Sequence, residues 1–452
     1  MSLLESVPAT ALGEHTTEHD APQPDRLGTA DTRTAVAASL IGTTVEWYDF
    51  FLYSTAAGLV FNTLFFPDTS AFVGTMLSFA TFAVGFLMRP IGGLVFGHIG
   101  DRIGRKRTLA LTMAIMGGST ALMGALPTSA SIGVAAPILL LALRILQGFA
   151  LGGEWAGAVL LAVEHSPRKK VGRFGSYPQI GLALGLALGT GVFALLRSTL
   201  SEQAFLTYGW RIAFGASVFL VLIGLIVRLK IDETPAFREI DRLNRISKVP
   251  VVELFRNARS RRNTVLGLLS RWGEGAAFNT WGVFAISFAT GQLGFRQVPV
   301  LLAVTTAALV MAALIPVSGN LTDRFGPRRV YIAGIAAYGL LVYPVFALFE
   351  VGNIAVFTIA IIAVFGVAHA VFYGAQGTLY AGLYPPEVRY TGLSFVYQFS
   401  GIYASGITPM IVTALIAAGG HTPWLACGYL VATAVISVIA TLFISEDDRL
   451  TA

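Results

Sequence analysis

The sequence predicts an all-α membrane protein with twelve transmembrane helices, arranged as two pseudo-symmetric six-helix bundles. Of its 452 residues, 55% are apolar and only 12% are charged, and its mean hydropathy of +0.70 exceeds that of soluble domains. Apolar segments of about 20 residues, long enough to cross a roughly 30 Å hydrocarbon core, recur along the chain. A charged, glycine-containing loop also occurs once in each half.

This repeated loop indicates an internal duplication. The first repeated loop reads Gly97-His-Ile-Gly-Asp101-Arg102-Ile-Gly104-Arg105-Lys106-Arg107, and the second reads Gly319-Asn-Leu-Thr-Asp323-Arg324-Phe-Gly326-Pro327-Arg328-Arg329. Each copy lies between two apolar segments, so the two halves are predicted to be structurally equivalent. Duplication of this kind is typical of a transporter.

The first bundle is expected at 36–230, after a disordered cytoplasmic tail at 1–35. The tail contains acids and prolines but no apolar core, which argues against a secretory signal. Turn residues and charges separate most of the predicted spans. These spans are 36–61, 72–96, 109–127, 138–162, 174–197 and 211–230.

A charged cytoplasmic linker at 231–261 leads to the second bundle at 262–444, and a short tail follows at 445–452. Its spans are 262–290, 298–321, 329–349, 354–380, 391–417 and 422–444. An even number of spans places both termini on one side of the membrane. Most of the 31 lysines and arginines fall on that side, so both termini are predicted to be cytoplasmic.

Composition also limits the functional classes. The loop asymmetry accounts for the net charge of +6 without a nucleic-acid partner. Cys427 is the only cysteine, which rules out an intramolecular disulfide or a thiolate metal cluster. The sequence shows no cofactor or metal motif and no catalytic signature. We therefore expect a protein that is not an enzyme, needs no cofactor and acts as a monomer in the lipid bilayer.

Charged side chains inside the predicted spans direct the functional hypothesis. A charge at the centre of a membrane helix costs about 2.5–3.5 kcal/mol, so it requires a partner or a cavity. These residues are Glu46, Asp49, Arg89, Arg144, Glu154, Arg271 and Glu274, and His369 can join them when protonated. Apart from Arg89, they lie on spans one, four, seven and ten, which are equivalent helices in a fourfold repeat of three-helix units. Such helices surround a site near the bilayer midplane.

Helical spacing predicts that polar faces converge on this site. Glu46, Asp49 and Tyr53 share one face of the first span, because their spacing is that of neighbouring helical turns. Closely spaced, desolvated carboxyls can exchange a proton, so buried titratable groups are candidates for proton coupling. The candidates are Asp49, Glu46, Glu154, Glu274 and His369. Arg271 and Glu274 could instead neutralise each other and only allow the helix to insert into the membrane. His369 could instead be a packing residue with no part in proton transfer.

Arginine side chains are the candidates for holding an anionic substrate. A guanidinium can bind a carboxylate through two parallel hydrogen bonds, and aromatic and amide groups could line the same pocket. The predicted substrate-binding residues are Arg144, Arg271, Trp47, Tyr53, Trp155, Trp281 and Gln147. The tryptophans could instead surround a quaternary ammonium through cation–π contacts, as in betaine recognition.

The repeated loops could act as a conformational latch between spans that rock against each other. An aspartate there can accept hydrogen bonds at a helix N-terminus, and surface ion pairs are weak enough to break in each cycle. The alternative role is topological anchoring alone. The predicted latch residues are Gly97, Asp101, Arg102, Gly104, Arg105, Asp323, Arg324, Gly326 and Arg89.

The first repeated loop resembles the signature between spans two and three of the major facilitator superfamily. Further stretches resemble its metabolite:proton symporter branch, namely Val45-Glu46-Trp47-Tyr48-Asp49-Phe50, Arg89-Pro90-Ile91-Gly92-Gly93, the segment from Arg144 to Gly157, and Pro386-Glu387-Val388-Arg389-Tyr390-Thr391-Gly392. The resemblance implies the major facilitator fold and relatedness to permeases for α-ketoglutarate, citrate, shikimate and proline or betaine. It also links Arg144 and Gln147 to proton coupling and Asp101 to the conformational cycle.

One departure from the signature concerns Pro327, which stands where the first loop has Arg105 and predicts a looser second latch. The predicted function is proton-coupled uptake of a small organic acid across the plasma (inner) membrane by alternating access. The alternatives are symport of a proline- or betaine-type zwitterion with protons and, less favoured, proton-coupled export.

Overall fold

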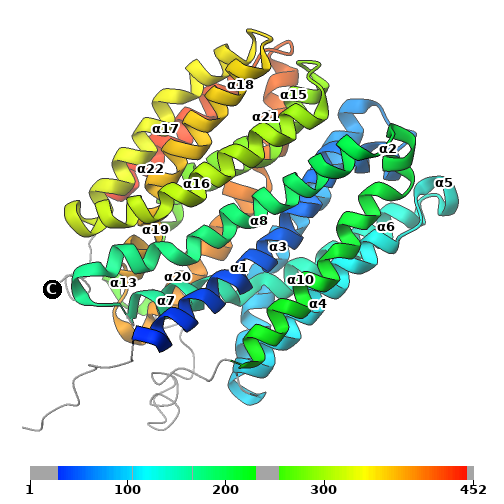
Figure 1. Ribbon diagram of the computed structural model, residues 1–452. Coiled ribbons are helices and arrows are strands. Elements are labelled where there is room, and N and C mark those ends of the chain that lie inside the picture. Colours follow the sequence, from blue (N-terminus) through cyan, green and yellow to red (C-terminus); the bar gives the residue numbers. More distant parts are fainter. Residues whose placement is uncertain (1–28, 104, 165, 231–253, 445–452) are drawn as a thin grey trace, which may run out of the picture.

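The computed structural model describes residues 29–103, 105–164, 166–230 and 254–444, and most of them are helical (Figure 1). Within these ranges, helices occupy all twelve predicted positions and no strand is present. Nine helices of the described chain are long and apolar enough to cross a membrane. The predicted all-α membrane fold is therefore confirmed.

The first half of the chain forms one bundle. Its helices are α1 (Thr29–Ala56), α2 (Asn62–Phe65), α3 (Ala71–Ile103), α4 (Arg105–Ala125), α5 (Ser129–Ile132), α6 (Ala135–Ala150), α7 (Glu154–Glu164), α8 (Val171–Thr199), α9 (Glu202–Ala204) and α10 (Trp210–Lys230). A π-helical turn at Ala57–Phe61 continues α1. Helix α1 begins at Thr29, before the predicted boundary at residue 36, and the predicted tail up to residue 28 lies outside the described residues.

The second half forms the other bundle. Its helices are α13 (Ala258–Ser270), α14 (Trp272–Asn279), α15 (Ala285–Gly291), α16 (Gln297–Phe325), α17 (Pro327–Phe349), α18 (Ile354–Ile361), α19 (His369–Ala381), α20 (Pro386–Ser400), α21 (Thr408–Ala418) and α22 (Trp424–Leu442). Most of the predicted linker, and the predicted tail at 445–452, lie outside the described residues.

Three predicted spans are helical but do not form one long apolar helix. Helix α1 carries Glu46 and Asp49, and the apolar part of α4 is limited to Ala110–Ala125. In span seven, α13 ends and α14 begins at Arg271. Helical hydrogen bonds continue through this point, from the Arg271 N–H to the Gly267 carbonyl oxygen and from the Gly275 N–H to the Arg271 carbonyl oxygen, each at 3.1 Å.

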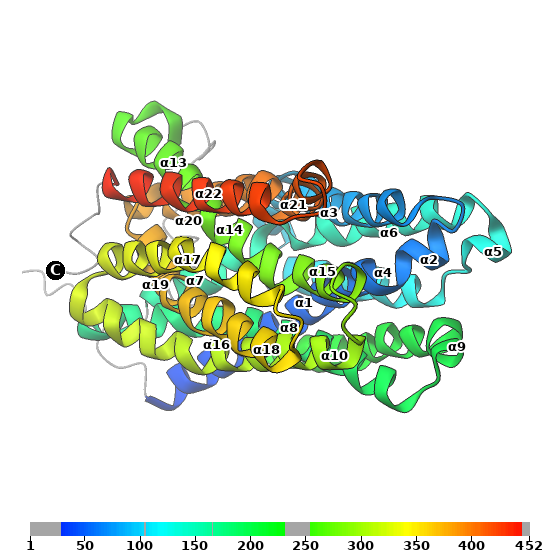
Figure 2. The same ribbon diagram turned by 90° about the horizontal axis from the view of Figure 1, so that it is seen from above.

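The two bundles meet along α8 and α16, which run side by side at the boundary between the halves (Figure 1, Figure 2). On the same boundary, α3 packs against α20 and α21, and α7 packs against α19 and α20. Residues far apart in the sequence are thus brought together between the bundles, where two pseudo-symmetric halves can enclose a shared site.

Glycines allow α3 and α6 to approach closely within the first bundle. A Cβ atom added to Gly148 would lie 2.2 Å from the carbonyl oxygen of Gly85, and one added to Gly92 would lie 1.7 Å from that of Phe149. Backbone atoms cannot yield to such a contact unless the helices separate. This packing fixes the spacing of the helices that carry Arg89 and Arg144.

We predict that Gly148→Ala destabilises the protein by about 1–3 kcal/mol, because the added methyl group overpacks the α3–α6 contact. The thermal unfolding midpoint of the detergent-purified variant should fall by several degrees. The control is Gly118→Ala on α4, where an added Cβ has no neighbour within 4 Å. An unchanged midpoint for Gly148→Ala would contradict the close packing of α3 and α6.

Candidate binding site

A central cavity lies between the two bundles. Its volume of about 10 Å³ leaves room for roughly one water molecule. The charged residues that line it are Arg89, Arg271 and Glu274. The remaining lining residues are Trp47, Phe50, Phe51, Phe86, Leu182, Phe278, Asn279, Tyr397 and Ser405. Both halves of the chain therefore contribute to a small, aromatic cavity with two cations and one acid.

Arg271 and Glu274 form a buried ion pair on the cavity wall. The distance from Arg271 Nη2 to Glu274 Oε2 is 3.2 Å, and the two side chains are 4% and 2% exposed. Arg271 Nη1 also donates to Ser400 Oγ at 3.0 Å and to the carbonyl oxygen of Tyr397 at 3.4 Å. Arg271 is the residue between α13 and α14, and both members of the pair line the cavity to which the two halves contribute.

Arg89 reaches the cavity from α3, in the first half of the chain. Its guanidinium carbon lies 4.3 Å from the ring centre of Phe50 and 4.4 Å from that of Phe86, so aromatic faces partly compensate its charge. Within the described residues, its Nε and Nη2 atoms have no hydrogen-bond acceptor. Glu46 and Arg271 both lie within electrostatic range of it. Arg89, which the sequence suggested as a latch residue, is thus positioned to face a bound anion.

Tyr397 connects the cavity to the contact between the halves. The guanidinium of Arg271 lies over the Tyr397 ring, and the distance from the guanidinium carbon to the ring centre is 3.8 Å. The indole of Trp155 stacks on the same ring with centroids 3.8 Å apart and an interplanar angle of 14°. Two groups this close to one ring centre must lie on its opposite faces. Trp155 is held by a 3.0 Å hydrogen bond from its Nε1 to Gln179 Oε1.

Arg144 lies inside the first bundle, behind the cavity wall. Its side chain is fully buried, donates to Gln147 Oε1, and packs 4.3 Å from the ring centre of Phe50 and 4.2 Å from that of Tyr53. Gln147 Nε2 in turn donates to Thr120 Oγ1 at 2.8 Å. Three predicted substrate-binding residues, Arg144, Gln147 and Tyr53, are thus brought together but do not line the cavity.

The acidic residues of α1 also lie away from the cavity. Asp49 is fully buried, and its Oδ1 accepts a hydrogen bond from Ser217 Oγ of α10. The face of α1 that lines the cavity carries Trp47, Phe50 and Phe51 instead. Phe51 stacks on Phe278 of the second bundle with centroids 5.0 Å apart. On this helix, the residues that meet the other bundle are aromatic.

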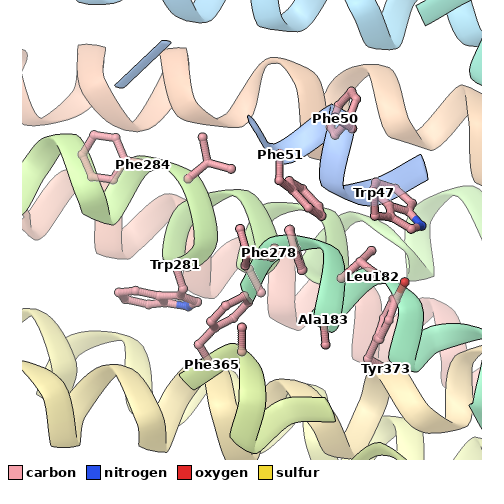
Figure 3. Packing of buried hydrophobic residues seen from close by; sticks show 14 of the residues in the cluster. Trp47, Phe50, Phe51, Leu182, Ala183, Phe278, Trp281, Phe284, Phe365 and Tyr373 are labelled. Atoms are coloured by element: carbon pink, nitrogen blue, oxygen red, sulfur yellow. The ribbon is translucent and has the colours of Figure 1, made fainter. Parts of the chain in front are cut away.

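His369 and Trp281 pack within the second bundle. Figure 3 shows Trp281 on the side of Phe278 that is remote from Trp47, and its ring centre lies 5.1 Å from that of Phe346. The His369 ring lies among aromatic rings, including Phe278 at 5.5 Å, and neither ring nitrogen has a hydrogen-bond partner in the described residues. Neither residue lines the cavity, and the Glu154 side chain lies outside the described part of the structure.

Polar contacts join the halves at the end of the molecule where Asp323 lies, which we call the Asp323 end. Asp323 of the second repeated loop accepts hydrogen bonds from the backbone nitrogens of Gly172 at 2.6 Å and Arg173 at 3.0 Å, at the start of α8. Arg389 forms an ion pair with Glu164 at 3.6 Å. A carboxylate at a helix N-terminus is favoured by the unpaired N–H groups there.

The rest of the repeated loops is described only in part. Gly326 has a φ of +86° and precedes Pro327, which begins α17. Proline suits this first helical position because the N–H group that it lacks would have no partner there. Arg324 is exposed and lies over the ring of its neighbour Phe325. The side chains of the predicted residues in the first loop, including Asp101, lie outside the described part.

Contacts also join the halves at the opposite end, which we call the Arg197 end. Arg197 Nε donates to Gln297 Oε1 at 2.6 Å, and the hydroxyls of Thr190 and Thr305 lie 2.8 Å apart. Both ends of the boundary are therefore joined around a cavity that holds about one water molecule. The cavity is too small for a metabolite in this arrangement of the bundles.

Sequence reasoning assigned no cavity role to Arg89, Tyr397, Asn279 or Ser405. Arg89 does not lie on one of the four equivalent helices, but a charged residue inside a membrane span could have indicated that it belongs to the site. The other three are uncharged, and their positions in the sequence carry no comparable signal. Among the described residues, no group of three or more His, Cys, Asp or Glu side chains could hold a metal ion.

Two pseudo-symmetric helical bundles with a charged, aromatic cavity between them are the architecture of a membrane transporter, and comparison with known proteins identifies its family. Residues 34–245 match the family model described as sugar (and other) transporter, and residues 274–451 match the model of the major facilitator superfamily. The chain is 37% identical to the shikimate transporter of Escherichia coli, over 95% of this chain and 98% of that protein. The protein belongs to the major facilitator superfamily.

Other relatives are also named as transporters of small molecules. The chain is 38% identical to the inner membrane metabolite transport protein YhjE of Escherichia coli, over 91% of this chain and 93% of that protein. It is 33% identical to the glycine betaine/proline/ectoine/pipecolic acid transporter OusA of Dickeya dadantii, over 92% and 83%. The solved xylose transporter XylE from E. coli aligns with a TM-score of 0.70 at 16% identity, over 92% of this chain and 99% of that one. Because the identity to XylE is low, this likeness supports the fold of the chain and says nothing about its substrate.

We predict that Asp323→Ala loosens the Asp323 end, because two backbone N–H groups of α8 lose their acceptor. For an exposed carboxylate, the loss should be about 1 kcal/mol, or roughly fivefold in the population of the open form. The measurement is the rate at which a thiol reagent labels Thr378→Cys, a buried position near α8, in a Cys427→Ala background. Labelling that is no faster than in the exposed-site control Asp68→Ala would contradict this role.

Proposed function

We propose that this transporter takes up a small organic acid together with protons across the inner membrane, by alternating access. The observation that carries the proposal is that Arg89 and Arg271, from opposite halves, line one central cavity. In this proposal, both termini and the Asp323 end are cytoplasmic, because lysine- and arginine-rich loops stay on that side. The Arg197 end faces the periplasm.

The two guanidiniums suit a carboxylate for a physical reason. Arg89 Nε and Nη2 and Arg271 Nε have no hydrogen-bond acceptor among the described residues, although all three atoms are buried. A carboxylate supplies acceptor pairs in the geometry of a guanidinium edge. Because the arginines belong to different bundles, a bound carboxylate would draw the halves together. The name of the shikimate transporter, a relative at 37% identity, supports an acid as cargo.

A zwitterion such as glycine betaine is the alternative, because the relative OusA is named for such substrates. The cavity has aromatic walls, but three of its aromatic rings already face guanidiniums. Arg89 covers Phe50 and Phe86, and Arg271 covers Tyr397. A cationic head group would therefore meet two positive charges at short range. The structure favours the acid.

Alternating access would use the contacts at the two ends in turn. The hydrogen bonds of Asp323 and the ion pair of Arg389 with Glu164 would close the cytoplasmic side, and the bond from Arg197 to Gln297 would close the periplasmic side. Exposed polar contacts are worth about 0–1 kcal/mol each, so they can break in every cycle. This assigns the second repeated loop the role of a latch.

We predict that proteoliposomes accumulate a labelled organic acid against its gradient when a pH gradient, acidic outside, is imposed. The probes are shikimate, α-ketoglutarate and glycine betaine, and empty liposomes are the control. Accumulation of an acid that collapses with a protonophore is the expected result, because the proton gradient supplies the energy. If only glycine betaine accumulates, the transported substrate is a zwitterion and not an organic acid. Uptake of an acid that ignores the pH gradient would refute proton coupling.

We predict that Arg89→Lys and Arg271→Lys each weaken binding of the transported acid by about 10- to 100-fold. A lysine ammonium can neither form two parallel hydrogen bonds to a carboxylate nor stack on the aromatic rings beneath it. The dissociation constant is measured by calorimetry on the purified protein. Arg296→Lys, at an exposed position before α16, is the matched control. If both cavity variants keep the wild-type constant, the carboxylate site is wrong.

A further inference from the structure

We propose that the substrate carboxylate and Glu274 compete for Arg271, and that protonation of Glu274 is the step that releases Arg271 to the substrate. This inference rests on the proposed function and adds the device by which proton and anion binding are linked. No covalent bond changes. One proton adds to the Glu274 carboxylate, and the Arg271 guanidinium exchanges its ion-pair partner, Glu274, for the substrate carboxylate.

The geometry makes the competition direct. The guanidinium nitrogen Nη2 of Arg271 that contacts Glu274 at 3.2 Å belongs to a side chain that lines the cavity, and Glu274 lines it as well. Of the acidic side chains in the described residues, only Glu274 lines this cavity. The Nη1 atom of Arg271 is occupied by Ser400 Oγ and the Tyr397 carbonyl oxygen. Since Arg271 Nε has no acceptor among the described residues, an anion that takes the Nε–Nη2 edge of this guanidinium competes with Glu274 at Nη2.

Charge balance supports one proton for each monoanion. Arg271 is paired with Glu274, and Arg89 lies within electrostatic range of Glu46. With both acids ionised, these four groups carry no net charge. Entry of a monoanion would leave one uncompensated negative charge in a buried site, which is strongly unfavourable. Protonation of Glu274 restores neutrality and removes the competitor at the same time.

Among the groups around this site, the Glu274 carboxyl is the one that can change its protonation state near neutral pH. Besides Arg271, its charged or titratable neighbours are phenols of α17, α19 and α20. These are Tyr331, Tyr373, Tyr380 and Tyr397. Phenols keep their protons at neutral pH, and guanidiniums stay charged throughout. A proton taken up at this cluster on anion binding therefore goes to a carboxyl, and Glu274 is the carboxyl in contact with the cavity.

The experiment measures the dissociation constants of shikimate and α-ketoglutarate between pH 5.5 and 8.5 for the wild-type protein, Glu274→Gln, Glu274→Asp and Asp49→Asn. For the wild type, binding should weaken about tenfold per pH unit once Glu274 is ionised, because each anion then brings one proton. Glu274→Gln should bind as tightly at high pH as the wild type does at low pH. It should exchange substrate but lose accumulation driven by the pH gradient.

Two variants and one spectroscopic signal separate this device from a structural role. Glu274→Asp should retain the pH dependence, and so should Asp49→Asn, since Asp49 does not line the cavity. Infrared difference spectra should show a protonated carboxyl band appear on substrate binding in the wild type and in Asp49→Asn but not in Glu274→Gln.

The possible failures can be told apart. If Glu274→Gln is folded and keeps the wild-type pH dependence, the competition is refuted while the transport proposal stands. If Glu274→Gln does not fold, the absence of the infrared band in the wild type refutes the competition by itself. A wild-type protein that binds neither acid at any pH overturns the proposed function, and this inference with it.

Discussion

The structure depends on how two arginine side chains are accommodated at the boundary between two apolar bundles. An unpaired charge inside a membrane protein is expensive, so each guanidinium needs compensation from the protein. Arg271 obtains it from Glu274 and from the Tyr397 ring, and Arg89 obtains it from the rings of Phe50 and Phe86. Each arginine therefore obtains this compensation within its own half of the chain, and the cavity between the halves brings the two guanidiniums to one site.

The same compensation explains why the central cavity is small and aromatic. Rings can face a cation without bringing an acceptor that would compete with an incoming anion. Arg89 is held in this way, so its free N–H donors remain available. Arg271 is held partly by an acid, and therefore its availability depends on the state of that acid. The two arginines are thus not equivalent, although both line one cavity.

The helical fold was predictable from the sequence because hydropathy and the repeated loop report directly on membrane spans. The contacts at the site were harder to predict from the sequence. Glu46, Asp49 and Tyr53 share a helical face in the sequence, but Asp49 bonds to Ser217 of α10, and aromatic residues occupy the cavity side of α1. Helical periodicity tells which residues share a face, whereas the direction of that face depends on how neighbouring helices pack. Arg89 could be recognised as a buried charge, but its ring partners depend on tertiary contacts.

Tyr397 links the cavity to the contacts at the Asp323 end. Opening the Asp323 end breaks the exposed contacts of Asp323 and Glu164, which water can replace at little cost. It must also separate Trp155 from Tyr397, and that exposes the buried ring on which Arg271 rests. Buried aromatic stacking is not replaced by water, so this contact opposes opening more strongly than the surface contacts do. Any change in the partner of Arg271 acts on a ring that also contacts the other bundle through Trp155. The ion pair in the cavity and the closure of the Asp323 end therefore share one side chain.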